Sequence, residues 1–113
     1  MDENINIELV LSSAAVQLKQ LDRFRAGLKI KNNSSHKLGF DISKTELWVN
    51  DVKNIAWDLT VQNGTLINLN IPAHSSRQVQ WPLGEALFPT SGSYRLNLRW
   101  GIISQTKDVV VFN

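Results

Sequence analysis

The stretch SGSYRLNLRWG, residues 91–101, alternates apolar and polar side chains between Tyr94 and Trp100. Its apolar members are Tyr94, Leu96, Leu98 and Trp100, and its polar members are Arg95, Asn97 and Arg99. A period of two places the two sets on opposite faces of a β-strand, so the stretch predicts a strand with one buried face. Two interpretations of the polar set follow: a solvated row of side chains, or a binding surface in which cations lie among aromatic residues.

The same alternation recurs in residues 5–11, 24–31, 55–62, 66–71 and 77–81, and further short strands are predicted in residues 38–42, 46–50 and 107–112. Turn signals separate these segments, among them Asn50-Asp51 and Asn63-Gly64. The second is a strong hairpin signal, because a type I′ turn needs positive φ at both central residues. Short strands separated by turns predict a single all-β domain over residues 1–113, an antiparallel immunoglobulin-like β-sandwich of about 7–9 strands.

Two segments lack a clear alternation of apolar and polar residues. Residues 12–25 carry apolar side chains at a rough period of 3.6, which leaves a short helix and an irregular edge crossing as alternatives. Residues 109–112, VVVF, are apolar and β-prone, so we expect them to be paired inside a sheet.

Composition excludes several classes of protein. The chain has 113 residues, of which 42% are hydrophobic and 19% charged, with a formal net charge of +2 and no cysteine. It is long enough to bury a core, and it has neither disulfides nor thiolate sites. The lack of cysteine slightly favours the cytoplasm over the periplasm or export, although a removed signal peptide would leave the same sequence. No stretch has the length of a membrane span, and no basic run indicates nucleic-acid binding.

Catalytic and metal-binding signals are weak. Both histidines, His36 and His74, lie in serine-rich turns, and no Gly-x-Ser-x-Gly elbow accompanies them. No pair of histidines or cluster of carboxylates has the spacing of a metal site. We therefore expect a protein that is not an enzyme and that has no cofactor.

The four tryptophans supply the first binding candidates. Trp57 and Trp100 share the parity of their aliphatic neighbours, which predicts that both lie in the core. Trp48 has the opposite parity to the apolar residues beside it, so it is the aromatic residue that we expect to be exposed. Trp81 precedes a proline at a strand end, where its side chain could line the rim of a cleft.

Basic and polar residues supply the remaining candidates. The turn that contains His74 and leads to Arg77 is one, and the outward pair Arg95 and Arg99 is another. A second basic row, Arg25, Lys29 and Lys31, follows an earlier strand. In an immunoglobulin-like strand order the two rows fall on opposite sheets, which would divide the basic surface.

A family resemblance supports the predicted fold. Residues 92–100, GSYRLNLRW, look like the F strand of an immunoglobulin-type sandwich, in which such a tyrosine forms a corner with the preceding loop. The order of FRAGLKIKNNSSHKLGFDI, AW and IPAHSSRQVQWPL before it resembles bacterial intracellular proteinase-inhibitor domains, which are small immunoglobulin-like sandwiches. The stretch LKIKNNSSHKLGFDISKTELWVND also resembles the water-stress and hypersensitive-response domain. Both resemblances consist of strands and turns, so they imply a fold and carry over no binding residue.

The functional hypothesis is a non-catalytic module that binds another protein, in the manner of a proteinase inhibitor or otherwise. The alternative is a carbohydrate-binding or cell-envelope accessory module in which exposed tryptophans stack on sugar rings. The residues that we expect to bind are Trp48, Trp81, His74, Arg77, Arg95 and Arg99. Nucleic acid is not an expected partner, and the oligomeric state stays open.

Overall fold

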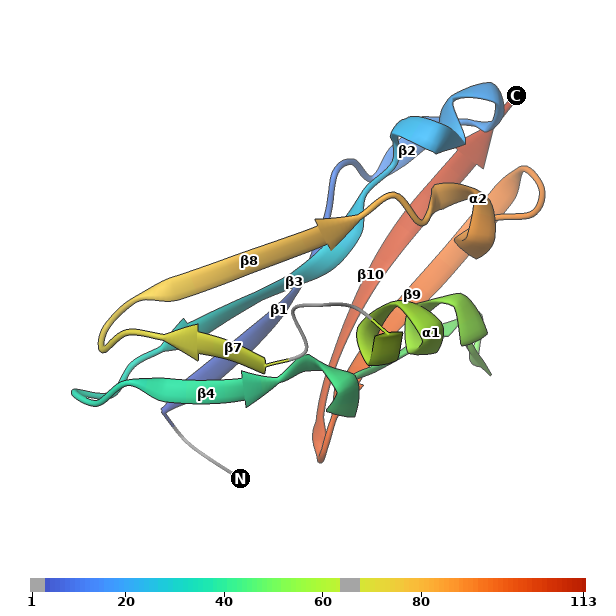
Figure 1. The fold of residues 1–113 in the computed structure, drawn as a ribbon. Helices are drawn as coiled ribbons and strands as arrows, with labels where there is room; N and C mark the ends of the chain where they lie inside the picture. The colour runs from blue at the N-terminus through green and yellow to red at the C-terminus, as the bar shows by residue number, and fades with distance from the viewer. Residues whose placement is uncertain (1–3, 64–67) are drawn as a thin grey trace.

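A computed structural model of the protein describes residues 4–63 and 68–113. Within these residues the chain is mostly β, with ten strands in mainly antiparallel sheets (Figure 1). The strands are β1 (Ile5–Leu11), β2 (Ala15–Gln17), β3 (Ala26–Asn32), β4 (Leu38–Asp41), β5 (Glu46–Val49), β6 (Val52–Lys53), β7 (Asn68–Ile71), β8 (Ser76–Trp81), β9 (Gly92–Trp100) and β10 (Ile103–Phe112). The helices are α1 (Ile55–Asn63), α2 (Gly84–Leu87) and the 3-10 helices η1 (Leu18–Arg23) and η2 (Ile42–Lys44).

The strands form two main sheets whose inner faces share one core. One sheet has the order β1-β3-β8, and the other has the order β2-β10-β9-β5-β6, while β4 and β7 form a separate pair. Figure 1 shows β1, β3 and β8 as one layer, with β9 and β10 in a second layer behind it. The fully buried side chains of the first sheet include Leu9 and Leu28, and those of the second include Leu47, Leu96 and Val109. The arrangement is therefore sandwich-like.

The alternation in residues 91–101 is confirmed. Leu96 and Leu98 of β9 are buried, whereas Arg95 is exposed. Tyr94 lies at the start of the strand, and its hydroxyl donates a hydrogen bond to the carbonyl oxygen of Thr90 at 2.7 Å. The expected corner with the preceding loop is thus present.

The C-terminal strand is paired as expected. Residues 109–111 of β10 lie between β9, which runs antiparallel to them, and β2, which runs parallel. The side chains of Val109 and Val111 are buried in the core.

The strand predicted over residues 55–62 is wrong, because this segment forms α1. Trp57 and Val61 are buried while Ile55 and Leu59 are exposed, so the buried pair is four residues apart on one helical face. In a strand these four side chains would all lie on one face, so their alternation predicts a strand although the segment forms a helix. The missed signal is Asn54, whose side-chain oxygen accepts a hydrogen bond from the backbone N–H of Trp57 at 2.8 Å and so caps the helix.

Turns and short elements account for the other differences. Asn50 and Asp51 have φ angles of 49° and 67° and close the predicted tight turn between β5 and β6. The hairpin predicted at Asn63-Gly64 does not begin there, since α1 extends to Asn63; Gly64 lies outside the described residues. Residues 12–25 contain both open alternatives, an edge strand (β2) and a short helix (η1). The described part has ten strands rather than about 7–9, since β2 and β6 are very short.

A buried asparagine joins two turns at one end of the sandwich. Asn32 is fully buried, and its amide nitrogen donates to the backbone carbonyls of His36 (2.7 Å), Ile71 (3.0 Å) and Pro72 (3.1 Å). Its side-chain oxygen accepts from the backbone N–H of Ser34 at 2.9 Å and from the Ser34 hydroxyl at 2.7 Å. One side chain therefore holds the turn between β3 and β4 against the end of β7.

Asn32→Ala should lower the free energy of unfolding by about 3 kcal/mol, because it leaves buried carbonyl groups without a donor. Asn32→Asp should cost more, since a carboxylate would face the same carbonyl oxygens. Urea denaturation measures both changes. The neighbouring Asn33→Ala, at an exposed side chain, is the matched control and should change stability by less than about 0.5 kcal/mol. Equal effects at the two positions would show that the network does not stabilise the fold.

Asp41 at the end of β4 gives the fold a dependence on acid pH. Its carboxylate accepts from the Ser43 hydroxyl at 2.6 Å and from the Ser43 backbone N–H at 3.0 Å, and these bonds lower the pKa of Asp41. A carboxyl group whose pKa is lower in the folded state stabilises the fold above its unfolded pKa of about 3.9, and this contribution is lost as the pH falls through the folded pKa.

Asp41→Asn should therefore reduce the loss of stability between about pH 5 and pH 2 relative to the wild type. Thermal unfolding followed by circular dichroism over this range tests the expectation. Asp22→Asn, at a position on the exposed side of η1, serves as the control. Parallel pH profiles of the wild type and Asp41→Asn would contradict it.

Candidate functional site

The outer face of the larger sheet carries an aromatic and charged surface at β5 and β9. Leu47 takes the inner face of β5, so Trp48 points outward. The strand register places Trp48 opposite Asn97, and it places Glu46 opposite Arg99. These four residues, Glu46, Trp48, Asn97 and Arg99, are called the β5–β9 platform below.

Direct contacts hold the platform side chains in place. The Arg99 guanidinium carbon lies 4.1 Å from the centre of the Trp48 ring, which is the geometry of a cation–π contact. The Trp48 indole N–H donates to the Glu46 carboxylate at 3.0 Å, and Arg99 Nε donates to the side-chain oxygen of Asn97. Asn97 in turn donates to the Thr106 hydroxyl of β10 at 3.0 Å. The platform is therefore ordered before any ligand binds.

Lys53 connects the platform to α1. It lies on β6 opposite Trp48, and its ammonium group is 3.2 Å from the Asp58 carboxylate and 3.6 Å from that of Glu46. The hydrogen bond and charge of Asp58, with a smaller contribution from Glu46, raise the pKa of Lys53. Lys53 therefore stays charged at neutral pH, and it links Glu46 on the sheet to Asp58 on α1.

An apolar groove lies around the β5–β6 edge from the platform, because Val52 is opposite Val49, which packs on the core, and so has the opposite face to Trp48. The groove has a volume of about 430 Å³, and its walls include Val52, Ile55, Pro89 and Tyr94. Val52 is 67% exposed and Ile55 is 71% exposed, which is unusual for large aliphatic side chains. Lys53 lines this groove and also contacts Glu46 of the platform. Exposed apolar side chains gathered at one place are typical of a protein-binding surface.

The structure brings together three of the six predicted binding residues. Trp48, Arg95 and Arg99 all lie on the outer face of the larger sheet, on β5 and β9. Arg95 is exposed and pairs with Asp108 of β10 at 3.3 Å. Their grouping follows from the pairing of β5 with β9.

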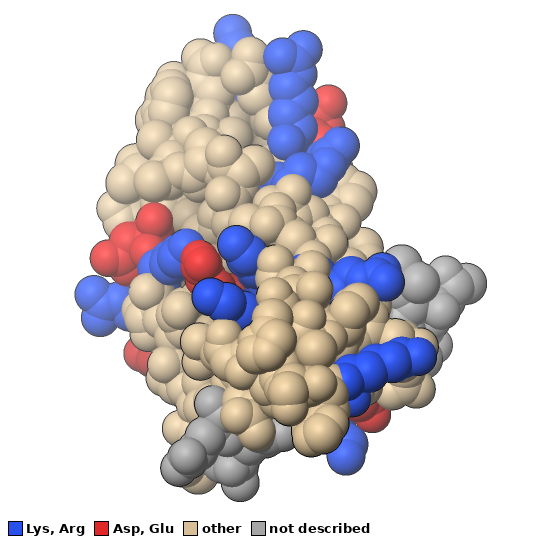
Figure 2. All heavy atoms as spheres, turned by 90° about the vertical axis from the view of Figure 1, so that its left-hand side faces the viewer, with Lys and Arg blue, Asp and Glu red and all other residues tan. Residues whose placement is uncertain are grey.

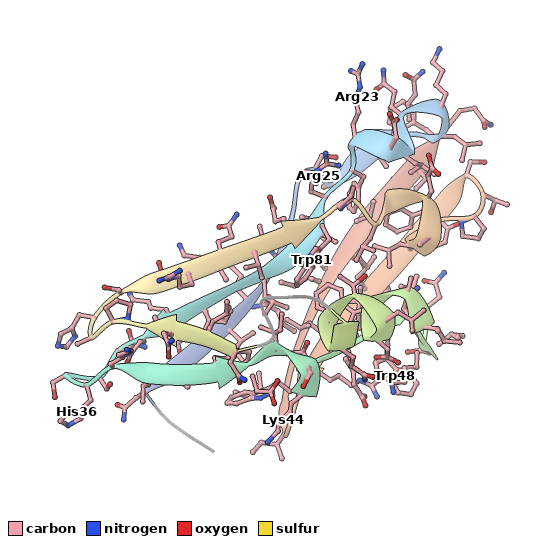
Figure 3. The ribbon with its side chains drawn as sticks, viewed as in Figure 1. Arg23, Arg25, His36, Lys44, Trp48 and Trp81 are labelled. Atoms are coloured by element: carbon pink, nitrogen blue, oxygen red, sulfur yellow. The ribbon has the colours of Figure 1, made fainter. Side chains whose placement is uncertain are left out.

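The other three predicted binding residues lie elsewhere. Trp81 is half-buried, and its ring meets the buried ring of Trp57 edge-on at 5.5 Å. His74 and Arg77 are exposed at the turn between β7 and β8 and at the start of β8. Figure 3 shows Trp48 and Trp81 apart, with His36 at the far tip of β4. The six residues therefore do not form one site.

The two basic rows lie on different sheets, as expected. Lys29 and Lys31 are on β3 of the smaller sheet, whereas Arg95 and Arg99 are on β9 of the larger one. Figure 2 shows Lys and Arg side chains spread over the face that it presents, with tan surface between several of them. The two rows therefore do not combine into one continuous basic patch of the kind that binds a phosphate backbone.

Sequence reasoning missed Glu46, Lys53 and Asp58 as parts of the site. Glu46 has the same parity as Trp48, so its place on the outer face was readable from the alternation. The position of Asp58 could not be predicted, because it depends on α1, and the alternation in this segment predicts a strand. Val52 and Ile55 carry no sequence signal for exposure.

The described side chains do not point to metal chemistry or to a membrane crossing. Residues 4–63 and 68–113 hold no group of three His, Asp or Glu side chains placed to bind a metal ion. In the same residues, no helix has both the length and the apolar composition that a membrane crossing requires.

Comparison with known proteins finds a similar fold among solved structures. No protein-family model and no curated protein sequence matches the chain. The β-glucosidase from Listeria innocua matches in its complexes with glucose (14% identity, TM-score 0.53), gluconolactone (13%, 0.52) and isofagomine (13%, 0.51). The match covers 96% of this chain and 16% of the β-glucosidase chain. At this identity the likeness shows the fold alone: this chain resembles one β-rich part of a much larger enzyme.

The contact between Arg99 and Trp48 should be measurable as a coupling energy. In a double-mutant cycle, Trp48→Ala and Arg99→Ala should show about 0.5–1 kcal/mol of coupling in urea denaturation. The matched cycle with Arg95→Ala, which removes a cation paired with Asp108, should be additive within about 0.5 kcal/mol. Equal coupling in both cycles would mean that the ring contact contributes nothing.

Proposed function

We propose that the protein is a non-catalytic, immunoglobulin-like module that binds another protein through the β5–β9 platform and the apolar groove around the same edge of the larger sheet. The observations that carry the proposal are the Trp48–Arg99 pair on the outer face of the larger sheet and the exposed side chains of Val52 and Ile55 around the β6 edge of the same sheet. Tryptophan and arginine are enriched among the residues that dominate binding energy, and an apolar centre supplies the area that binding buries.

The strand order supports the immunoglobulin-like part of the proposal. The sheet β1-β3-β8 corresponds to an A-B-E order, and the order β10-β9-β5-β6 corresponds to G-F-C-C′. The bond from Tyr94 to Thr90 has the form of the tyrosine corner at the start of strand F. The helix α1 departs from this scheme, because it occupies the connection between β6 and β7.

The platform side chains are held in fixed positions by contacts within the sheet, and this supports a binding role over a purely structural one. Trp48 and Arg99 already have hydrogen-bond partners within the sheet, so a partner would not need to immobilise them from a mobile state. Preordered side chains lower the entropic cost of association. The half-buried state of Trp48 still leaves part of its surface for contact.

A proteinase-inhibitor role is the narrower form of this proposal. It would require an exposed turn to enter a protease cleft, and the turn between β7 and β8 has suitable exposure at His74 and Arg77. His74 has a φ of 55°, and its backbone N–H donates to the carbonyl of Ser34 at 3.1 Å, which holds the turn in one conformation. Titration of purified proteases with the wild type and Arg77→Ala would separate this role from binding at the platform.

The alternative function is carbohydrate binding, with Trp48 as the stacking residue. The similar β-glucosidase structures are complexes with glucose, gluconolactone and isofagomine, but the match covers 16% of that chain. In this protein Arg99 covers one face of the Trp48 ring, so a sugar could not stack on that face unless Arg99 moved. This geometry favours a protein partner over a carbohydrate.

The test compares immobilised wild type with Trp48→Ala and Ile55→Asp as baits for proteins from the source organism. A specific partner should bind the wild type and lose at least about tenfold in affinity with either variant when purified and titrated. Arg77→Ala, at a distant exposed site, should bind as the wild type does. Binding that survives both Trp48→Ala and Ile55→Asp would refute the proposed surface, and glycan-array binding that depends on Trp48 would favour the alternative.

A further inference from the structure

The first strand of the smaller sheet leaves one of its edges open. β1 pairs with β3 on one side, and the described residues supply no strand partner on its other side. An open edge presents unpaired N–H and C=O groups, which proteins normally protect with lysine, proline or a bulge. β1 has the sequence INIELVL, which contains neither lysine nor proline.

The hydrogen-bond pattern shows which residues face the open edge. The Ser12 N–H donates to the carbonyl of Arg25, and the carbonyl of Asn4 accepts from the Asn33 N–H, so even-numbered residues turn their main-chain groups toward β3. Backbone groups alternate sides along an antiparallel strand. The main-chain groups of Ile5, Ile7 and Leu9 therefore face the open edge.

A side chain from the other sheet marks where the open edge ends. The side-chain oxygen of Gln105 on β10 accepts a hydrogen bond from the Leu9 N–H. Beyond Leu9, toward the N-terminus, the edge borders a groove of about 430 Å³ whose walls include Ile5, Ile7, Ile103 and Gln105. The unprotected part of the edge is thus the pair Ile5 and Ile7.

We propose that this edge pairs with the same edge of a second copy of the chain, with β1 antiparallel to β1 about a two-fold axis at Asn6. Ile5 of one copy then lies opposite Ile7 of the second copy, and the reverse. Each such pair exchanges two hydrogen bonds, so the contact forms four main-chain bonds and joins the two small sheets into one of six strands. The bond from Leu9 to Gln105 stays intact.

The side chains of β1 complement one another in this register. On the inner face, Ile5 and Ile7 of each copy meet and extend one apolar surface. On the outer face, Asn6 lies opposite Asn6 of the second copy, and Glu8 keeps Lys29 as its cross-strand neighbour. The two Lys31 side chains lie three strand spacings apart, about 14 Å, where salt screens their repulsion. No like charges are directly opposed.

Charge also distinguishes a second copy from an unrelated acidic strand. An added strand would run directly beside Glu8, whereas Lys29 and Lys31 lie one strand farther away on β3. An acidic side chain opposite Glu8 would be repelled, whereas the β1 sequence itself presents only Asn4 at that place in the proposed register. The chain's own β1 is therefore a suitable occupant of this edge.

The pairing should be weak, because so short an edge buries less area than a stable dimer interface. Amide hydrogen exchange by NMR, between about 10 µM and about 1 mM protein, provides the decisive readout. The amides of Ile5 and Ile7 should exchange at least about tenfold more slowly at the high concentration, whereas those of Asn6 and Glu8, already bonded to β3, should not change. Sedimentation over the same range should show a monomer–dimer equilibrium.

Ile5→Pro and Ile5→Ala form the matched pair of variants. Both remove the side chain, but only proline removes the N–H that faces the edge, and proline is tolerated at the first residue of an edge strand. Ile5→Pro should weaken self-association at least about tenfold more than Ile5→Ala, with circular dichroism confirming that both fold. A chain that stays monomeric at 1 mM overturns the proposal, as does a dimer in which Ile5 and Ile7 exchange at the monomer's rate.

Discussion

The hydrogen bonds of Asn32 hold one end of the sandwich together, at the turn between β3 and β4 and at the end of β7. Asn32 is the last residue of β3, and its backbone N–H donates to the Ser75 carbonyl while its side chain donates to the carbonyls of Ile71 and Pro72. Because the side chain is fully buried, water cannot replace these bonds when they are lost. The same residue therefore sets where β3 ends, how the chain turns into β4, and where β7 passes into β8.

The larger sheet depends on a different interaction, the pairing of β5 with β9. This pairing places Leu47 beside Leu98 in the core and, on the other face, sets Trp48 opposite Asn97. The core and the β5–β9 platform are thus two faces of the same strand pair. A substitution that shifted the register by one residue would exchange the faces and abolish both.

The two open features of the molecule differ in chemistry. The groove beside β5 and β6 presents exposed aliphatic side chains, which suit a partner's side chains. The edge of β1 presents main-chain groups, which suit another strand. The groove and the β1 edge belong to different sheets, so occupation of one is compatible with occupation of the other.

The buried and exposed faces of strands could be predicted from the sequence where local alternation and tertiary structure agree. The faces of β1, β3, β9 and β10 were predictable, and so was the corner at Tyr94. The strand predicted at residues 55–62 is wrong, because apolar residues at every second position also include pairs four residues apart, which a helix places on one face. The cap at Asn54 stabilises the helix. Half of the predicted binding residues were brought together, because Trp48, Arg95 and Arg99 share an outer face, whereas Trp81 packs on Trp57.

The sequence by itself determined which side chains share a face of each strand, because that depends only on the alternation of successive residues. Only the tertiary structure decided which strands are neighbours. Backbone hydrogen bonds are the same for every choice of partner strand, so the order of strands follows from how the whole core packs. For this reason Arg99 could be placed on an outward face from the sequence, while its contact with Trp48, a residue 51 positions away, required the folded sheet.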